Sequence, residues 1–212
     1  MRNKFDQQLE TLNDKMNEMG ALIEDAINGA VLALTKQNVK QAKGVIDFDK
    51  EIDQKEKEIE HLCLKLLLQQ QPVAKDLRQI SSALKMVTDM ERIGDQAADI
   101  SQLAIEMADV QYFSCFKNIV KMSEVTKEMV KLSVEAFINA DLELAEKLLY
   151  YDDMVDELFN VVKTDMINVI NKNIENGEQA VDLLMVAKYF ERIGDHAENI
   201  AEWVVYSITG TH

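Results

Sequence analysis

The chain has 212 residues, of which 47% are hydrophobic, with one proline, seven glycines and a formal net charge of -15. This charge disfavours direct binding to the phosphate backbone of nucleic acids, and the abundance of Leu, Ala, Glu, Lys, Met and Gln predicts an all-α protein with few, long elements. The chain shows no signal peptide and no apolar run near the roughly 20 residues of a membrane span, so we expect a cytoplasmic protein that reaches a membrane only peripherally, through partners.

Three helices are predicted in the first half of the chain by apolar residues at steps of three and four. The first covers residues 5–40, and the second runs from about 45 to 70, where Pro72 stops it. The third covers about 74–107. Residues 108–116 are predicted to be a connector, although strong helix breakers are absent from them.

The same cycle follows in the second half of the chain. Helices are predicted over about 117–139, 142–173 and 178–207, with Asn176 and Gly177 marking the last turn. We therefore expect six long helices in two tandem three-helix bundles, with a first domain at 1–107 and a second at 117–212.

An internal duplication is visible directly in the residues. The segment Glu91–Ile100 matches Glu191–Ile200 at an offset of 100, and both copies begin Glu-Arg-Ile-Gly-Asp. In the preceding helices, an Asp-x-x-x-Asp pair starting at Asp49 matches one starting at Asp152 at an offset of 103. The difference of three residues falls in a turn, where a change in length costs little. These matches indicate two copies of one three-helix unit.

The repeated acids are expected beside the apolar stripe in the second and fifth helices, and on the side opposite to the stripe in the third and sixth. A turn of about 100° per residue places Met90, Ile93 and Ala97 on the core side of the third helix, and Met185, Ile193 and Ala197 on that of the sixth. The acids project elsewhere, and like charges four residues apart destabilise a helix by about 0.2–0.5 kcal/mol. Converging carboxylates favour a bound cation or a proton, and oxygen ligands suit hard ions. The alternative is a solvated acidic face, which the matching positions in both units make less favoured.

Arginine and glycine occupy matching places inside the two motifs. We expect Arg92 and Arg192 to form ion pairs with the acids of the second helix of their unit, and an anion contact is the alternative. Gly94 and Gly194 lie within helices, where glycine costs about 1 kcal/mol relative to alanine. Close packing of a neighbouring helix is the favoured reason, and space for a cluster is the other.

Signals for other functions are weak. Glu58-x-x-His61 resembles half of a di-iron site, but a helical bundle needs that motif twice and the sequence has no second copy. Neither a glycine-rich phosphate loop nor a nucleophile with an adjacent base is found, so we predict that the protein is not an enzyme. His196 is expected on the surface, and the cysteines are expected to be reduced thiols.

The two ten-residue motifs and the two Asp-x-x-x-Asp pairs resemble the PhoU family over essentially the whole chain. The resemblance implies a homodimeric, cytoplasmic, negative regulator of phosphate uptake and of phosphate-starvation signalling. It also implies two partners, the ATPase subunit of a phosphate ABC transporter and a phosphate sensor histidine kinase.

The resemblance further implies bound divalent or trivalent metal ions, such as iron, zinc, magnesium or manganese. The family pattern often has Asn where the first unit has Asp99, so the two clusters are expected to differ in charge. A helical-bundle metal store or metallo-oxidase, and a metal-free acidic scaffold, remain alternatives. The matching ligand positions are Asp49, Asp53, Glu91 and Asp95 in the first unit and Asp152, Asp156, Glu191 and Asp195 in the second, and the additional candidates are Asp99, Asn199, Arg92 and Arg192.

Overall fold

The computed structural model describes residues 2–69 and 72–211, and within these ranges the chain forms six long α-helices without β-strands. The all-α prediction with two tandem three-helix bundles is confirmed. The first unit contains α1 (Arg2–Lys36), α2 (Val39–Gln69) and α3 (Ala74–Glu106). The second contains α4 (Phe116–Asn139), α5 (Leu142–Lys172) and α6 (Gly177–Thr209), with the short 3-10 helix η1 (Ile174–Asn176) before α6.

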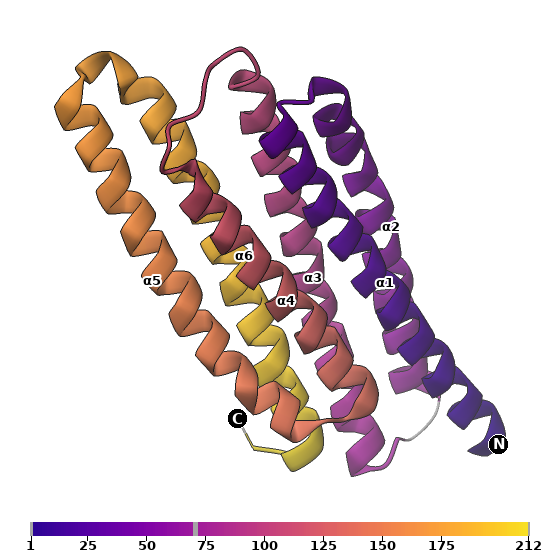
Figure 1. Ribbon diagram of the computed structural model, residues 1–212. Helices are drawn as coiled ribbons and strands as arrows, with labels where there is room; N and C mark the ends of the chain where they lie inside the picture. Colours follow the sequence, from indigo (N-terminus) through magenta and orange to yellow (C-terminus); the bar gives the residue numbers. More distant parts are fainter. Residues whose placement is uncertain (1, 70–71, 212) are drawn as a thin grey trace.

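The two units lie side by side and run in opposite directions along the bundle (Figure 1). In each unit the three helices pack on one another, while α3 packs along α6 and α1 contacts α4 between the units. Figure 1 shows α2 and α5 at the two outer edges. The helices that carry the repeated motif, α3 and α6, are therefore also the helices that join the units.

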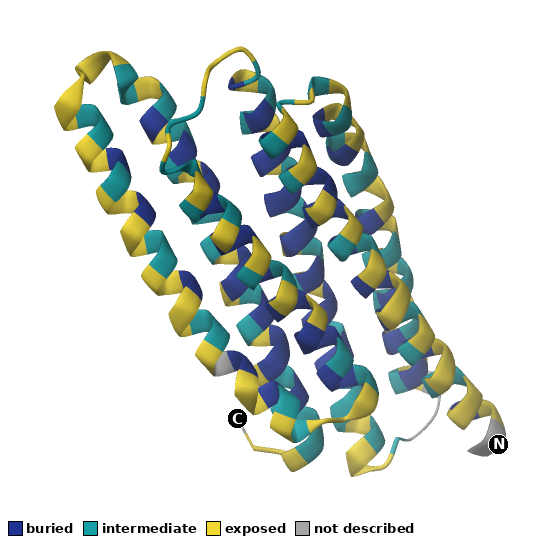
Figure 2. Cartoon of the chain, in the orientation of Figure 1, coloured by how far each residue is buried: buried dark blue, intermediate teal, exposed yellow. Residues whose placement is uncertain are grey.

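One continuous core runs through both units, and Figure 2 shows its buried stripes along the helices. The predicted core positions Met90, Ile93 and Ala97 are fully buried, as are Ile193 and Ala197. None of the described helices has the length and apolar character needed to cross a membrane.

The prediction that Met185 belongs to the core is wrong. Its side chain is 39% exposed, and Val186 and Phe190 fill the core at that level of α6. Eight residues separate Met185 from Ile193, so at about 100° per residue the two side chains point about 80° apart. Met185 therefore falls at the edge of the buried stripe.

The first turn also differs from the prediction. The chain leaves α1 at Lys36 and enters α2 at Val39, although continuous helix was expected to residue 40. Gln37 adopts a left-handed conformation with φ of 50°, and the Asn38 side chain accepts a hydrogen bond from the backbone N–H of Gln41. The side chain of Gln37 also donates to two backbone oxygens of the connector, at Met107 and Val110. This turn is thus specified by side-chain contacts rather than by glycine or proline.

Candidate metal centres

The first acidic cluster lies between α2 and α3, which pack along each other. Burial, together with the negative charges of Asp95 and Asp53, raises the pKa of Asp49 to about 6. Burial likewise raises the pKa of Glu91 to about 7, with Asp95 as the largest charged contributor. The four predicted ligands of this unit are therefore brought into one electrostatic environment.

Gly94 allows the Asp49 carboxylate to lie against α3. A Cβ atom at Gly94 would meet Ile52 Cδ1 at 2.9 Å and Asp49 Oδ1 at 3.2 Å. The predicted close packing at this glycine is confirmed. Asp49 Oδ1 is buried and accepts no hydrogen bond, and a buried polar atom without a partner is costly. A cation or a proton at this oxygen would remove that cost.

The first cluster extends further along both helices. Burial raises the pKa of Glu56 on α2, and the charges of Glu60 and Asp53 add to the rise. Burial and then Asp95 raise the pKa of Asp99 on α3. The acids therefore continue about two turns beyond Asp53 on α2, as far as Glu60, and about one turn beyond Asp95 on α3.

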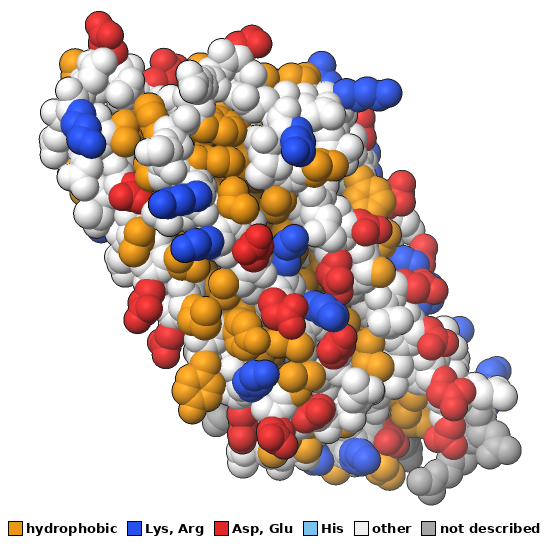
Figure 3. Space-filling model, in the orientation of Figure 1, with side chains coloured by type: hydrophobic (Ala, Val, Ile, Leu, Met, Phe, Trp, Pro, Cys, Tyr) orange, Lys and Arg blue, Asp and Glu red, His pale blue; other side chains and the backbone are white. Residues whose placement is uncertain are grey.

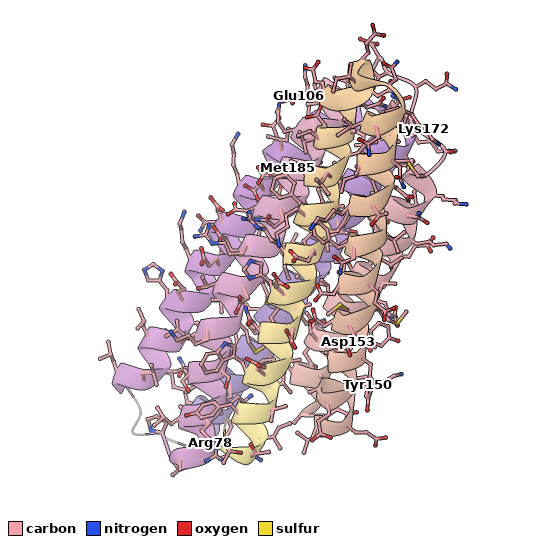
Figure 4. All side chains as sticks on the ribbon, turned by 90° about the vertical axis from the view of Figure 1, so that its left-hand side faces the viewer. Arg78, Glu106, Tyr150, Asp153, Lys172 and Met185 are labelled. Carbon is pink, nitrogen blue, oxygen red and sulfur yellow. The ribbon has the colours of Figure 1, made fainter. Side chains whose placement is uncertain are left out.

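The second cluster has the same arrangement between α5 and α6. Burial raises the pKa of Asp152, with Asp156 and Asp195 as the next causes. Burial also raises the pKa of Glu198, mainly together with the charge of Asp152. Figure 4 looks onto these two helices and labels Asp153, next to Asp152, on the lower part of α5. Asp156 and Asp195 are exposed, so this cluster is more open than the first.

The arginines of the motifs do not follow the expected pattern. Arg92 Nη1 lies 3.0 Å from Asp95 Oδ2, and Arg92 Nε lies 3.5 Å from Glu91 Oε2. The ion pairs of Arg92 therefore lie within α3, and the prediction of pairs with α2 is wrong for this residue. The charge of Arg192 opposes the rise in the pKa of Asp99, so Arg192 acts across the boundary between the units.

Lys188 is a neighbour of the second cluster that the sequence analysis missed. Its ammonium group forms an ion pair with Glu191 and lies 5.5 Å from the ring centre of Phe159. The spacing of three residues between Lys188 and Glu191 on one helix was the signal that could have revealed it.

A polar seam joins the units where α3 meets α6. Asp89 Oδ1 lies 2.8 Å from Nδ1 of His196 and accepts a hydrogen bond from the Asn199 amide at 3.1 Å. At the corresponding place the Tyr189 hydroxyl donates to Asp99. His196 is therefore partly buried between the units, and its predicted surface position is wrong. Asp89 and Tyr189 occupy matching positions at the offset of 100, which was an available signal.

The chemistry of both clusters fits a hard cation, with carboxylate oxygens from two packed helices and the unpartnered Asp49 oxygen. The side chains do not enclose an ion as they are placed: in residues 2–69 and 72–211 no three His, Cys, Asp or Glu side chains gather around one point. Ligation would require carboxylates on neighbouring helices to turn toward one another. Metal binding therefore remains a prediction.

A hollow outside the two clusters favours no particular ligand. Acidic and basic side chains are interspersed over the face formed by α1 and α4 (Figure 3). A hollow of about 320 Å³ on this face is lined by Glu24, Glu128, Lys127 and Lys131, among others, so its charges are mixed. The clusters between α2 and α3 and between α5 and α6 are the better candidates, because their acids recur at matching positions.

Comparisons with known proteins agree with this architecture. The family model described as the PhoU domain matches residues 16–104 and again residues 119–204, once in each unit. A protein of Clostridium acetobutylicum named phosphate-specific transport system accessory protein PhoU homolog is 36% identical over 210 residues, which cover 99% of this chain and 96% of that protein. A protein of the same name from Aquifex aeolicus is 40% identical over 189 residues, covering 89% and 86%. The crystal structure of PhoU from Pseudomonas aeruginosa superposes with a TM-score of 0.94 at 32% identity, covering 98% of this chain and all of that one.

Proposed function

The chain belongs to the PhoU family, and we propose that it is an accessory protein of a phosphate transport system that restrains phosphate uptake and the phosphate-starvation response. The observation that carries this proposal is the match over nearly the full length of relatives that bear this accessory role in their names. The role we propose is regulatory, not catalytic.

We further propose that the protein is an adaptor between the ATPase subunit of the phosphate ABC transporter and the sensor histidine kinase, and that it acts as a homodimer. The arrangement of the units supports an adaptor, because α2 and α5 lie at opposite edges of the bundle (Figure 1). Two partners could therefore contact separate surfaces at the same time.

The partner proposal is tested by binding and by phosphate uptake. Immobilised protein should retain the purified ATPase subunit. In a strain from which the gene has been deleted, phosphate uptake should be unrestrained, and adding the gene back should lower it again. A metal-transport ATPase subunit of the same class provides the control for non-specific binding. Failure of the wild-type protein in both assays would overturn the proposed role in transport.

Metal binding at the two acidic clusters is the second part of the proposal. Asp49, Asp53, Glu91 and Asp95 would hold an ion between α2 and α3, and the four matching acids would hold one between α5 and α6. When bound, the ion supplies positive charge that offsets the mutual repulsion of the carboxylates. The protein side chains fix the spacing of the helices, and Gly94 keeps α2 close to α3.

The metal proposal is tested on purified protein by elemental analysis before and after reconstitution with Mn²⁺. The wild-type protein should bind Mn²⁺, and a variant with both Asp95→Ala and Asp195→Ala should bind much less. Binding should also raise the melting temperature of the wild type only. A wild-type protein that stays metal-free after reconstitution would refute the metal proposal without affecting the partner proposal.

No observation favours a metallo-oxidase. Glu58 is engaged in an ion pair with Lys15 at 2.8 Å, and Nδ1 of His61 lies 2.7 Å from the backbone oxygen of Lys57. The Glu58 carboxylate of the Glu-x-x-His motif is therefore already paired with a lysine, and the sequence has no second copy of the motif.

A further inference from the structure

The two acidic clusters differ in the cations that the protein itself provides. In the second cluster the ammonium group of Lys188 pairs with Glu191, one of the predicted ligands. The Glu191 side chain is only 14% exposed and that of Lys188 is 37% exposed, so the pair is partly shielded from water. The contact with the ring of Phe159, 5.5 Å away, further holds the ammonium group at this place.

The first cluster has no matching ammonium group. The position that corresponds to Lys188 at the offset of 100 is Thr88, and the one that corresponds to Phe159 at the offset of 103 is Glu56. A neutral side chain and an additional acid thus replace the lysine and the aromatic ring.

The nearest cation of the first cluster is more weakly engaged with the matching glutamate. Arg92 lies closer to Asp95, at 3.0 Å, than to Glu91, at 3.5 Å, and its side chain is 56% exposed. Screening by water weakens the effect of such an exposed charge. Glu91 therefore has no partner comparable to the one that Lys188 provides for Glu191.

We propose that Lys188 is a built-in competitor for the cation of the second cluster, so that the two clusters bind the same ion with unequal affinity. The proposal rests on the metal binding proposed above. An ion that takes Glu191 as a ligand must break its pair with Lys188 and must approach against the charge of the ammonium group. At Glu91 an ion would displace only the longer contact with the exposed Arg92, at 3.5 Å. The first cluster therefore fills at a lower ion concentration, and the second cluster responds to a higher one.

The experiment measures the two clusters separately in the full-length protein. Asp49→Asn with Asp53→Asn leaves only the second cluster intact, and Asp152→Asn with Asp156→Asn leaves only the first. Free Mn²⁺ is followed by electron paramagnetic resonance during titration of each protein. We expect the first cluster to bind Mn²⁺ about tenfold more tightly than the second, which corresponds to about 1.4 kcal/mol.

Exchange of the two matching residues then tests the role of Lys188 directly. In the protein that retains the second cluster, Lys188→Thr should tighten Mn²⁺ binding about tenfold, and Lys188→Gln should give a similar gain. In the protein that retains the first cluster, Thr88→Lys should weaken binding. Lys172→Thr is the matched control, because this lysine lies at the far end of α5 (Figure 4) and should leave the affinity unchanged. Circular dichroism confirms that each variant is folded.

The outcomes separate the two proposals. Unchanged affinity after Lys188→Thr and Lys188→Gln would overturn the competitor role, and weaker binding would show instead that Lys188 positions Glu191. An equal gain from Lys172→Thr would attribute the effect to net charge and would also overturn the proposal. If neither single-cluster protein nor the wild type binds Mn²⁺, the metal function itself fails.

Discussion

Replacing Gly94 by alanine tests the idea that this glycine sets the distance between α2 and α3. A methyl group there would lie 2.9 Å from Cδ1 and 3.0 Å from Cγ2 of Ile52, and 3.2 Å from Asp49 Oδ1. Ile52 is fully buried, so its side chain has little space to move away. The substitution should therefore force the two helices apart or distort the Asp49 carboxylate.

The expected magnitude follows from two opposing effects. Overpacking of a close-packed core costs about 1–3 kcal/mol, and the change from glycine to alanine in a helix returns about 1 kcal/mol. We expect Gly94→Ala to lower the free energy of unfolding by about 1 kcal/mol. Gly194 is the matched control, because a Cβ there would meet Val155 at 3.4 Å and Met129 Sδ at 3.7 Å, which are ordinary contacts. Gly194→Ala should therefore stabilise the protein by up to about 1 kcal/mol.

Urea unfolding followed by circular dichroism measures both variants at one pH without metal. The two alanine substitutions should differ by about 2 kcal/mol in opposite directions. Equal changes in the free energy of unfolding would refute the reasoning, because they would show that Ile52 accommodates the added methyl group. Gly94→Ala should also reduce Mn²⁺ binding by the first cluster, whereas Gly194→Ala should leave that cluster unaffected.

Three further predictions concern stability. Since the pKa values of Asp49 and Glu91 are raised to about 6 and about 7, the folded protein binds more protons than the unfolded chain between about pH 4 and pH 7. Without metal, the free energy of unfolding in urea should therefore fall as the pH rises through this window, by about 2 kcal/mol after solvent screening, and Asp49→Asn with Glu91→Gln should flatten the profile. Asp141→Ala removes the side chain that accepts the Leu144 N–H at the start of α5 and should cost about 1 kcal/mol in a thermal melt, whereas Asp141→Asn should cost less. Phe190→Ala empties a fully buried position and should cost about 3–5 kcal/mol in the same assay; a loss below 1 kcal/mol would contradict its core role.

The fold was accessible from the sequence because helical periodicity and duplication both report on it. Ile93 and Ile193 lie in the apolar stripes, and both are fully buried as expected. The same periodicity placed Glu91 on the side of the helix opposite to Ile93, whereas the Glu91 side chain is only 17% exposed and burial raises its pKa to about 7. Turns marked by Pro72 and Gly177 were also located to within a few residues. A pattern of steps along one helix suffices for these features.

Features that depend on two helices at once could not be obtained in this way. The turn at Gln37 depends on backbone oxygens of the distant connector, at Met107 and Val110. Arg92 was expected to pair with an acid of α2, but it pairs instead with Asp95, three residues further along its own helix. Periodicity assigns a side chain to a face, but it does not choose among the groups within reach of that face.

The contacts between the units explain why some matching positions are identical and others are not. Glu91 and Glu191 both lie toward the second helix of their own unit, where the matching Asp-x-x-x-Asp pairs begin at Asp49 and Asp152, and the residue type is the same in both copies. Positions on the seam meet the other unit, whose sequence is different. Asp89 therefore contacts His196, while Tyr189, which matches Asp89, contacts Asp99. Because α3 and α6 run in opposite directions, Asp89 and Tyr189 form two separate contacts along the seam. Each contact requires only that its own two side chains are complementary. The proposed ligand positions would lack this freedom, since an ion bound in one unit would need its four carboxylates together.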